Sequence, residues 1–308
     1  MDSKSILDGA DRIYAALESG KPFFIGRNGS SEMEAVSFWH IHRNTSSYRF
    51  IRPWNAQLLV KLERGAGVWP ATEDSCDSWS KEYTESLTLL DGVAAGWYQP
   101  LKMLEHTLLN TYAPHAFLMP LRSLEPYYVE PENRWTQLLA GKRVAVVSSF
   151  AKTIQAQVWK DGIWNHTETI LPPTTFWIPI QTYYSPTVSL GDCTAWPTGI
   201  GSWDDAATMI VDEVVKSGAS IALIGCGGLG MIVGGRLKRK GISSIILGGA
   251  IQVLFGIKGL RWETHDIISK FWNDSWVWPS ASETPSGALK IERGCYWENR
   301  SSPSTTPR

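Results

Sequence analysis

Apolar residues recur at helical spacing through most of residues 1–140. The helices expected from this spacing cover residues 4–19, 78–97 and 101–110. A short apolar stretch at residues 22–26 interrupts them and is expected to form a strand. The pattern therefore predicts an N-terminal half that is mostly helical.

From residue 141 onwards, buried apolar runs alternate with amphipathic segments. Strands are expected within residues 142–150, 219–225 and 242–249, and helices within residues 151–162, 204–218 and 228–241. Strands that alternate with helices in this way are typical of parallel βαβ units. We therefore predict an α/β fold, in which a Rossmann-like parallel sheet is flanked by helices and the N-terminal half carries a mostly helical insertion.

The same pattern predicts a single α/β domain over residues 1–298. Its N-terminal half covers residues 1–140 and its βαβ half covers residues 141–298. Residues 299–308 are a polar tail of Ser, Pro and Thr, which lacks the apolar surface needed for packing and is expected to be disordered.

Composition narrows the classes of partner and compartment. Hydrophobic residues make up 43% of the chain and charged residues 19%, which is typical of a globular protein. The net charge of −1 favours neither nucleic acid nor an anionic membrane surface as a partner. The N-terminus has no apolar stretch of signal-peptide length and the uncharged run 219–235 contains six glycines, so we expect a cytoplasmic protein without a transmembrane segment.

A glycine-rich turn follows the strand expected at 219–225. Gly225, Gly227 and Gly230 have G-x-G-x-x-G spacing between this strand and the next helix. Such a turn lets a diphosphate approach the backbone and the free amides of the helix N-terminus. A dinucleotide site also needs an acidic residue after the second strand, where this chain has Gly248 and Gly249. Another phosphate-bearing ligand, or tight helix–strand packing alone, remains open.

A second strand-to-helix turn reads RNGSSEME and contains Arg27, Gly29, Ser31 and Glu32. Ser31 and Glu34 have the spacing of a capping box, in which Ser31 caps the helix and Glu34 reaches back to it. Glu32 would then begin the helix, where a carboxylate also gains from the helix dipole, so a purely structural role is an alternative. Arg27 favours function, because ligands of open α/β sheets bind at the carboxyl ends of strands.

A third turn follows the strand expected within residues 142–150. Ser148 and Ser149 end this strand, and Lys152 lies at the start of the next helix. Hydroxyl groups, amides and a lysine at such a turn can bind phosphate. A helix cap without a ligand is the structural alternative for these serines.

Several segments together resemble a group of proteins from polysaccharide gene clusters. This group is similar to the GT-D family of glycosyltransferases. The resemblance covers residues 20–298 and rests on IGRNGSSE, AGVWP, LLDGVAAGW, GKRVAVVSSFAKTIQAQ, ALIGCGGLG, LGGAIQVLFGIKGLRW, FWNDSWVWPSASETP and CYW. The most specific of these is GGAIQVLFGIKGLRW at residues 248–262.

This resemblance implies a nucleotide-sugar donor, an acceptor hydroxyl on a glycan or small molecule, and a divalent metal such as manganese or magnesium. Glu32 matches the glutamate of the family's D-x-E motif and would bind the metal, while Ser30 occupies the place of the aspartate. Further donor-binding residues are expected in the matching segments, at Gly228, Gly248, Gly249 and Gln252.

The sequence therefore predicts a glycosyltransferase involved in polysaccharide biosynthesis. Glu32 would position the diphosphate, Arg27 and the Gly225–Gly230 turn would neutralise the leaving nucleotide, and Asp91 would serve as the base. A solvated surface carboxylate is the alternative for Asp91. An NAD(P)-dependent oxidoreductase and a non-catalytic nucleotide-sugar-binding protein are the alternative functions.

Overall fold

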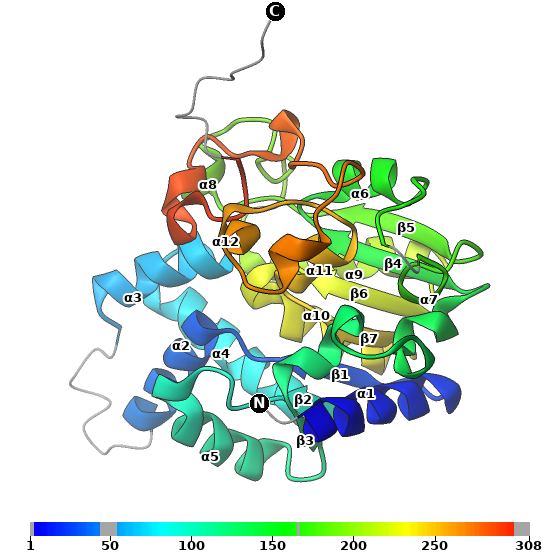
Figure 1. Ribbon diagram of the computed structural model, residues 1–308. Helices are drawn as coiled ribbons and strands as arrows, with labels where there is room; N and C mark the ends of the chain where they lie inside the picture. The colour runs from blue at the N-terminus through cyan, green and yellow to red at the C-terminus, as the bar shows by residue number, and fades with distance from the viewer. Residues whose placement is uncertain (1–2, 44–53, 165–166, 299–308) are drawn as a thin grey trace, which may run out of the picture.

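The computed structural model describes residues 3–43, 54–164 and 167–298. These residues form a seven-stranded parallel sheet with the strand order β3-β2-β1-β7-β6-β4-β5 (Figure 1). The strands are β1 (Phe24–Arg27), β2 (Gly92–Ala94), β3 (Phe117–Met119), β4 (Arg143–Ser148), β5 (Phe176–Gln181), β6 (Ile221–Gly225) and β7 (Ser243–Ile246). The predicted fold class is confirmed.

Helices cover both faces of this sheet. The first face packs against α2 (Ser30–Arg43), α4 (Glu73–Leu87), α5 (Lys102–Tyr112), α9 (Trp203–Lys216) and α10 (Gly230–Arg239). The second face packs against α1 (Ser3–Glu18), α6 (Ala151–Gln157), α7 (Thr167–Ile170) and α11 (Ala250–Leu254). Alternate residues of the apolar strands enter the two cores: Val144 and Val146 face one, and Ala145 and Val147 face the other.

Shorter helices complete the described chain. They are α3 (Ala56–Lys61), α8 (Pro186–Ser189), α12 (Leu260–Glu263), a π-helical turn (Leu62–Ala66) and 3-10 turns at Gln99–Leu101, Leu121–Leu124, Pro126–Tyr128, Pro131–Asn133, Trp135–Leu139, Gly227–Leu229, Ile268–Phe271, Ala281–Glu283, Ala288–Lys290 and Glu292–Gly294. The C-terminal residues, coloured orange to red, lie beside α8 and α12 (Figure 1). The predicted tail, residues 299–308, lies outside the described residues.

One predicted helix was wrong in its second half. The helix expected over residues 78–97 ends at Leu87, and residues 92–94 form β2. A strand of three residues is too short for a periodic signal, and only pairing with β1 and β3 defines it. Gly92 is required there because the Phe117 ring occupies the space that a side chain would need.

Both halves of the chain contribute to the sheet. The N-terminal half is mostly helical, as predicted, and it also supplies β1, β2 and β3. These strands join the C-terminal strands through the pairing of β1 with β7. Within the described residues, no helix is long and apolar enough to cross a membrane.

The connections place a crevice between β4 and β6. These neighbouring strands pair so that Ser148 lies opposite Gly225 at their carboxyl ends. The helix after β4, α6, packs on one face of the sheet, whereas the helix after β6, α10, packs on the other. Such a divergence opens a crevice at the carboxyl edge, where ligands of α/β proteins bind.

Helix α10 approaches β1 closely because it carries glycine at position 234. A Cβ atom on Gly234 would lie 2.5 Å from Cε2 of Phe24. Overpacking of this kind costs about 1–3 kcal/mol, which outweighs the gain of about 1 kcal/mol for alanine over glycine in a helix. We expect Gly234→Ala to lower the free energy of unfolding, measured in urea, by about 1–2 kcal/mol.

The control is Arg239→Ala, which changes an exposed side chain on the same helix. It should leave the free energy of unfolding within about 0.5 kcal/mol of the unchanged protein. A Gly234→Ala variant as stable as this control would contradict the proposed close packing.

Candidate functional site at the carboxyl edge of the sheet

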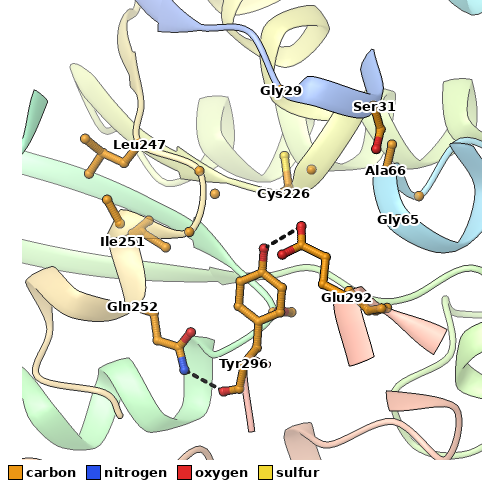
Figure 2. Close-up of a pocket in the computed structure, with 18 of the residues that line it drawn as sticks. Gly29, Ser31, Gly65, Ala66, Cys226, Leu247, Ile251, Gln252, Glu292 and Tyr296 are labelled. Atoms are coloured by element: carbon orange, nitrogen blue, oxygen red, sulfur yellow. Dashed lines mark hydrogen bonds between the residues drawn. The ribbon is translucent and has the colours of Figure 1, made fainter. Parts of the chain in front are cut away.

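A cavity of about 630 Å³ opens at the carboxyl edge of the sheet. This volume lies within the range of small-molecule sites, about 300–1,000 Å³. Its walls come from the turns after β1, β4, β6 and β7, from the π-helical turn Leu62–Ala66 and from the C-terminal segment 291–297. Figure 2 shows how these distant segments face one another around the cavity. The structure therefore brings together the 27–32 and 225–230 turns.

The first turn presents a cation and a carboxylate to this cavity. Arg27 ends β1, and its guanidinium lies 4.6 Å from the centre of the Trp97 ring. Within the described part of the chain, this guanidinium has no hydrogen-bond acceptor. Glu32 lies in the first turn of α2 and its carboxylate folds back over Gly29, where any side chain would overlap it. Arg27, Gly29, Ser31 and Glu32 all line the cavity.

The predicted capping box was wrong. The first helical hydrogen bond of α2 runs from the Met33 amide to the Gly29 carbonyl at 2.9 Å, so Gly29 caps the helix in place of Ser31. Glu34 instead pairs with the Lys61 ammonium. The helix therefore begins earlier than the Ser31–Glu34 spacing suggested, and Glu32 rather than Glu34 reaches back to the cap.

A buried network fixes the conformation of the first turn. The Asn28 side chain donates to Glu105 at 2.9 Å and accepts from the Tyr83 hydroxyl at 2.8 Å. The Trp97 indole donates to the Asn28 carbonyl at 3.0 Å, and Glu105 also accepts from the Gly96 amide at 2.7 Å. Because these buried polar groups satisfy one another, the turn that carries Arg27 is held rigidly.

The glycine-rich turn after β6 divides into two parts. Gly225 and Gly227 line the cavity, whereas Gly228 and Gly230 lie behind it. A Cβ atom on Gly230 would lie 3.1 Å from Ile246, and the Gly228 carbonyl accepts from the Trp79 indole at 3.1 Å. The front glycines are packed as tightly, because a Cβ atom on Gly225 would lie 2.7 Å from the Gly248 carbonyl and one on Gly227 would lie 2.9 Å from the Ala66 carbonyl. Packing thus accounts for all four glycines, and a ligand contact remains a prediction for the front two.

Gly248 and Gly249 lie between two arginines. A Cβ atom on Gly248 would lie 2.6 Å from the Arg27 guanidinium, and one on Gly249 would lie 3.0 Å from the Arg261 guanidinium. Gly248 also has a φ of 57°, which favours glycine. The two glycines therefore allow both guanidinium groups to lie against the backbone at the end of β7.

The third predicted turn is already occupied by a carboxylate. Glu283 accepts from the amides of Lys152 and Thr153 at the start of α6, at 2.8 and 3.2 Å. The Ser148 hydroxyl accepts from the Phe150 amide, and the Ser149 hydroxyl accepts from Tyr184. Ser148 and Ser149 line the cavity, but the exposed Lys152 does not. Glu283 therefore occupies two of the amides that this helix terminus would offer to a phosphate.

The structure does not bring Asp91 to the cavity. Asp91 directly precedes β2, at the amino edge of the sheet, opposite the edge where the cavity opens. Its carboxylate accepts from the Phe24 amide and pairs with Lys238, both at 2.7 Å. The segment around Asp91, expected within the helix over residues 78–97, instead leads into β2, so this carboxylate does not line the cavity and its role as a base stays a prediction.

The sequence analysis missed a cluster on the far wall of the cavity. Arg261 donates to Glu292 at 2.7 Å and to the Tyr296 hydroxyl at 2.8 Å. Tyr296 in turn donates to Glu292 at 3.4 Å, as Figure 2 shows. The guanidinium also lies 4.7 Å from the centre of the Tyr296 ring. The signals in the sequence were two motifs of the resembling family, LGGAIQVLFGIKGLRW, which contains Arg261, and the late CYW, which contains Tyr296.

Burial raises the pKa of the Glu32 carboxyl, and the backbone hydrogen bond and the charges of Arg27 and Lys61 act in the opposite direction. The charge of Glu292 raises it further. Burial also raises the pKa of the Cys226 thiol, which lines the cavity, to about 12. Cys226 is therefore a neutral thiol near pH 7 and a poor nucleophile.

The donor atoms around Glu32 do not form a metal site from protein groups alone. In residues 3–43, 54–164 and 167–298, no group of three or more His, Cys, Asp or Glu side chains could hold a metal ion. Glu32 has Arg27 and Lys61 as charged neighbours, and Ser30 stands where the resembling family carries a second acid. Metal binding at Glu32 stays a prediction.

Comparison with known proteins leaves the activity open. No protein-family model matches the chain, and no curated protein matches it. The chain is similar to a solved structure described as a new glycosyltransferase (DUF1792) from Streptococcus sanguinis, with a TM-score of 0.44 and 12% sequence identity. This match covers 92% of the present chain and 95% of the other chain. A likeness of this degree assigns neither an activity nor site residues.

The raised pKa of Glu32 makes stability depend on pH. Because the pKa of Glu32 is raised in the folded state, its protonated form stabilises the folded protein. This contribution is fully present below the unfolded-state pKa and is lost as the pH rises through the folded-state pKa. Glu32→Gln removes the titration. We therefore expect Glu32→Gln to melt at a higher temperature than the unchanged protein at about pH 8, and the difference to vanish near about pH 4.

Differential scanning calorimetry at both pH values measures this difference. Glu132→Gln, at an exposed position outside the cavity, serves as the control and should show no difference at either pH. A Glu32→Gln variant that is equally or less stable at the higher pH would contradict the effect of burial on the pKa of Glu32.

Proposed function

We propose that the protein is a glycosyltransferase that moves a sugar from a nucleotide-sugar donor to an acceptor hydroxyl. The observation that carries this proposal is the convergence of Arg27, the start of α2 and the glycine turns after β6 and β7 on one cavity. These groups are the ones that bind a diphosphate in α/β proteins.

The diphosphate would lie against Arg27 and the first turn of α2. The first amides of a helix have no partners within it, and α2 has 14 residues, so its N-terminus supplies partial positive charge. The Arg27 guanidinium is free to bind phosphate oxygens, because no described residue accepts a hydrogen bond from it. Arg64 and Lys61 add positive charge to the lining of the same cavity.

In the proposed reaction, the acceptor oxygen forms a bond to the anomeric carbon of the sugar. The bond from this carbon to the diphosphate oxygen breaks, and the electron pair leaves with the diphosphate. Negative charge therefore develops beside Arg27 and the α2 N-terminus, which would stabilise the transition state electrostatically. The role of these groups is to neutralise the leaving nucleotide.

Glu32 replaces Asp91 as the proposed base. Glu32 lines the cavity, whereas Asp91 lies outside it. Burial raises the pKa of Glu32 towards the pH at which a general base works best. The carboxylate would take the proton from the acceptor hydroxyl as the new glycosidic bond forms. The resemblance assigns a different role to Glu32, that of metal ligand, and activity with and without manganese distinguishes the two.

Two other functions make distinct predictions. A non-catalytic nucleotide-sugar-binding protein would account for Ser30 in the place of an acid, and it would bind the donor without turnover. A dinucleotide-dependent oxidoreductase would need an acidic residue after β7, where Gly248 and Gly249 stand. Incubation with UDP-, GDP- and dTDP-sugars, followed by measurement of released nucleotide, separates the transferase from both.

Arg27→Gln should weaken the binding of the nucleoside diphosphate that the protein binds best. Loss of a charge-assisted hydrogen bond costs about 1.5–3 kcal/mol, so the dissociation constant should rise about 10- to 100-fold in isothermal titration calorimetry. Lys152→Gln removes a cation from a predicted site residue outside the cavity and should leave binding unchanged. Equal effects of the two substitutions would contradict the assignment of Arg27.

Glu32→Gln should reduce nucleotide release by about 100-fold or more, because a general base typically contributes about 10²- to 10⁴-fold to the rate. Its affinity for the free nucleoside diphosphate should be retained. Asp91→Asn is the matched control, since it also neutralises one carboxylate but lies at the other edge of the sheet. Full turnover by Glu32→Gln, or equal loss in both variants, would remove Glu32 from the mechanism.

A further inference from the structure

The far wall of the cavity contains a buried hydrogen-bond acceptor that has no partner among the described residues. Gln252 is 0% exposed and lines the cavity, yet its Oε1 atom has no hydrogen bond to any described residue. Its Nε2 atom donates to the carbonyl oxygen of Lys258 at 2.7 Å and to that of Tyr296 at 2.8 Å. Figure 2 shows the bond to Tyr296. Rotation of the amide would set oxygen against these carbonyls, so the orientation of Oε1 is fixed.

A second hydrogen-bond acceptor, Glu292, lines the cavity beside the Tyr296 hydroxyl, whereas Gln252 lies at the backbone end of Tyr296 (Figure 2). Arg261 and Tyr296 hold its carboxylate, and the side chain remains 50% exposed. Its backbone lies in the left-handed region, with φ values of 43° at Glu292 and 60° at Arg293. Non-glycine residues adopt this conformation only at an energetic cost, so the backbone at Glu292 and Arg293 is strained.

These two groups differ from the opposite wall in the kind of ligand atom that they can bind. An amide oxygen and a carboxylate only accept hydrogen bonds, and phosphate oxygens at neutral pH also only accept them. Gln252 and Glu292 therefore require a ligand group with O–H or N–H donors. One wall of the cavity, formed by Arg27 and the start of α2, donates hydrogen bonds. The other wall, formed by Gln252 and Glu292, accepts them.

The two walls meet at the glycine pair after β7. Gly248 lies against Arg27, and Gly249 lies against Arg261 and within 3.3 Å of the Tyr296 ring, measured from the Cβ position. Adjacent residues of this turn therefore contact Arg27 on one side and Arg261 and Tyr296 on the other, so a ligand bound at the turn can reach both walls.

We propose that Gln252 and Glu292 form the subsite for the sugar ring of the donor and bind its hydroxyl groups. This assignment rests on the proposed glycosyltransferase function and goes beyond it, because it sets the direction in which the donor lies. The diphosphate contacts Arg27 and the sugar points towards the C-terminal segment. Gln252, expected from the sequence to bind the donor, is thereby assigned to the sugar of the donor.

The test compares two glycine substitutions at neighbouring left-handed residues. Glu292→Gly and Arg293→Gly both relieve the backbone, but only Glu292 lines the cavity. Binding is measured by calorimetry for UDP, GDP and dTDP and for UDP-glucose, UDP-galactose, UDP-N-acetylglucosamine, GDP-mannose and dTDP-glucose. The melting temperatures of both variants should be no lower than that of the unchanged protein. If Glu292→Gly melts at a lower temperature, Glu292→Gln is used in its place.

Glu292→Gly should raise the dissociation constant of the best-bound nucleotide sugar about 10- to 100-fold. It should change the dissociation constant of the corresponding free nucleoside diphosphate by less than about twofold. Arg293→Gly should change neither. An equal loss for sugar and diphosphate, or no loss for the sugar, would overturn the subsite while the proposed function stands. If the unchanged protein binds none of these ligands, the proposed function and the subsite both fall.

Discussion

The pairing of β1 with β7 is the interaction on which the cavity depends. It joins three strands from the N-terminal half to four strands from the C-terminal half, with Phe24 opposite Ser244 and Ile25 opposite Ile245. Because the strands are parallel, their carboxyl ends lie at one edge. The pairing therefore sets Arg27, at the end of β1, beside the Gly248–Gly249 turn after β7.

Helix N-termini at this edge are used in different ways. The start of α6 is closed by Glu283, a residue 2% exposed that bonds the Lys152 and Thr153 amides. The start of α2 instead carries Glu32 over Gly29 and faces the cavity. The same local motif, a strand followed by a polar turn and a helix, thus serves packing in one place and faces a cavity in the other. A residue far away in the sequence decides between them.

Charge is distributed unevenly around the cavity. Arg27 has no hydrogen-bond acceptor among the described side chains, whereas Arg261 is engaged by Glu292 and Tyr296. The two guanidinium groups therefore differ in what they can offer a ligand, although both lie against the same glycine pair. Among the described residues Arg27 has no hydrogen-bond acceptor, whereas Arg261 orients the Glu292 carboxylate. This division underlies the proposed direction of the donor.

The sequence by itself determined the fold class and the turns after β1, β6 and β7, because apolar periodicity, glycine and helix-forming residues act locally. It did not determine β2 and β3, since strands of three residues have no periodic signal and exist through their partners. Only the tertiary structure decided which edge Asp91 occupies, that Glu283 bonds the first amides of α6 and that Glu32 and Glu292 line the same cavity. These facts depend on contacts between residues far apart in the chain, and the local spacing of residues does not indicate such contacts.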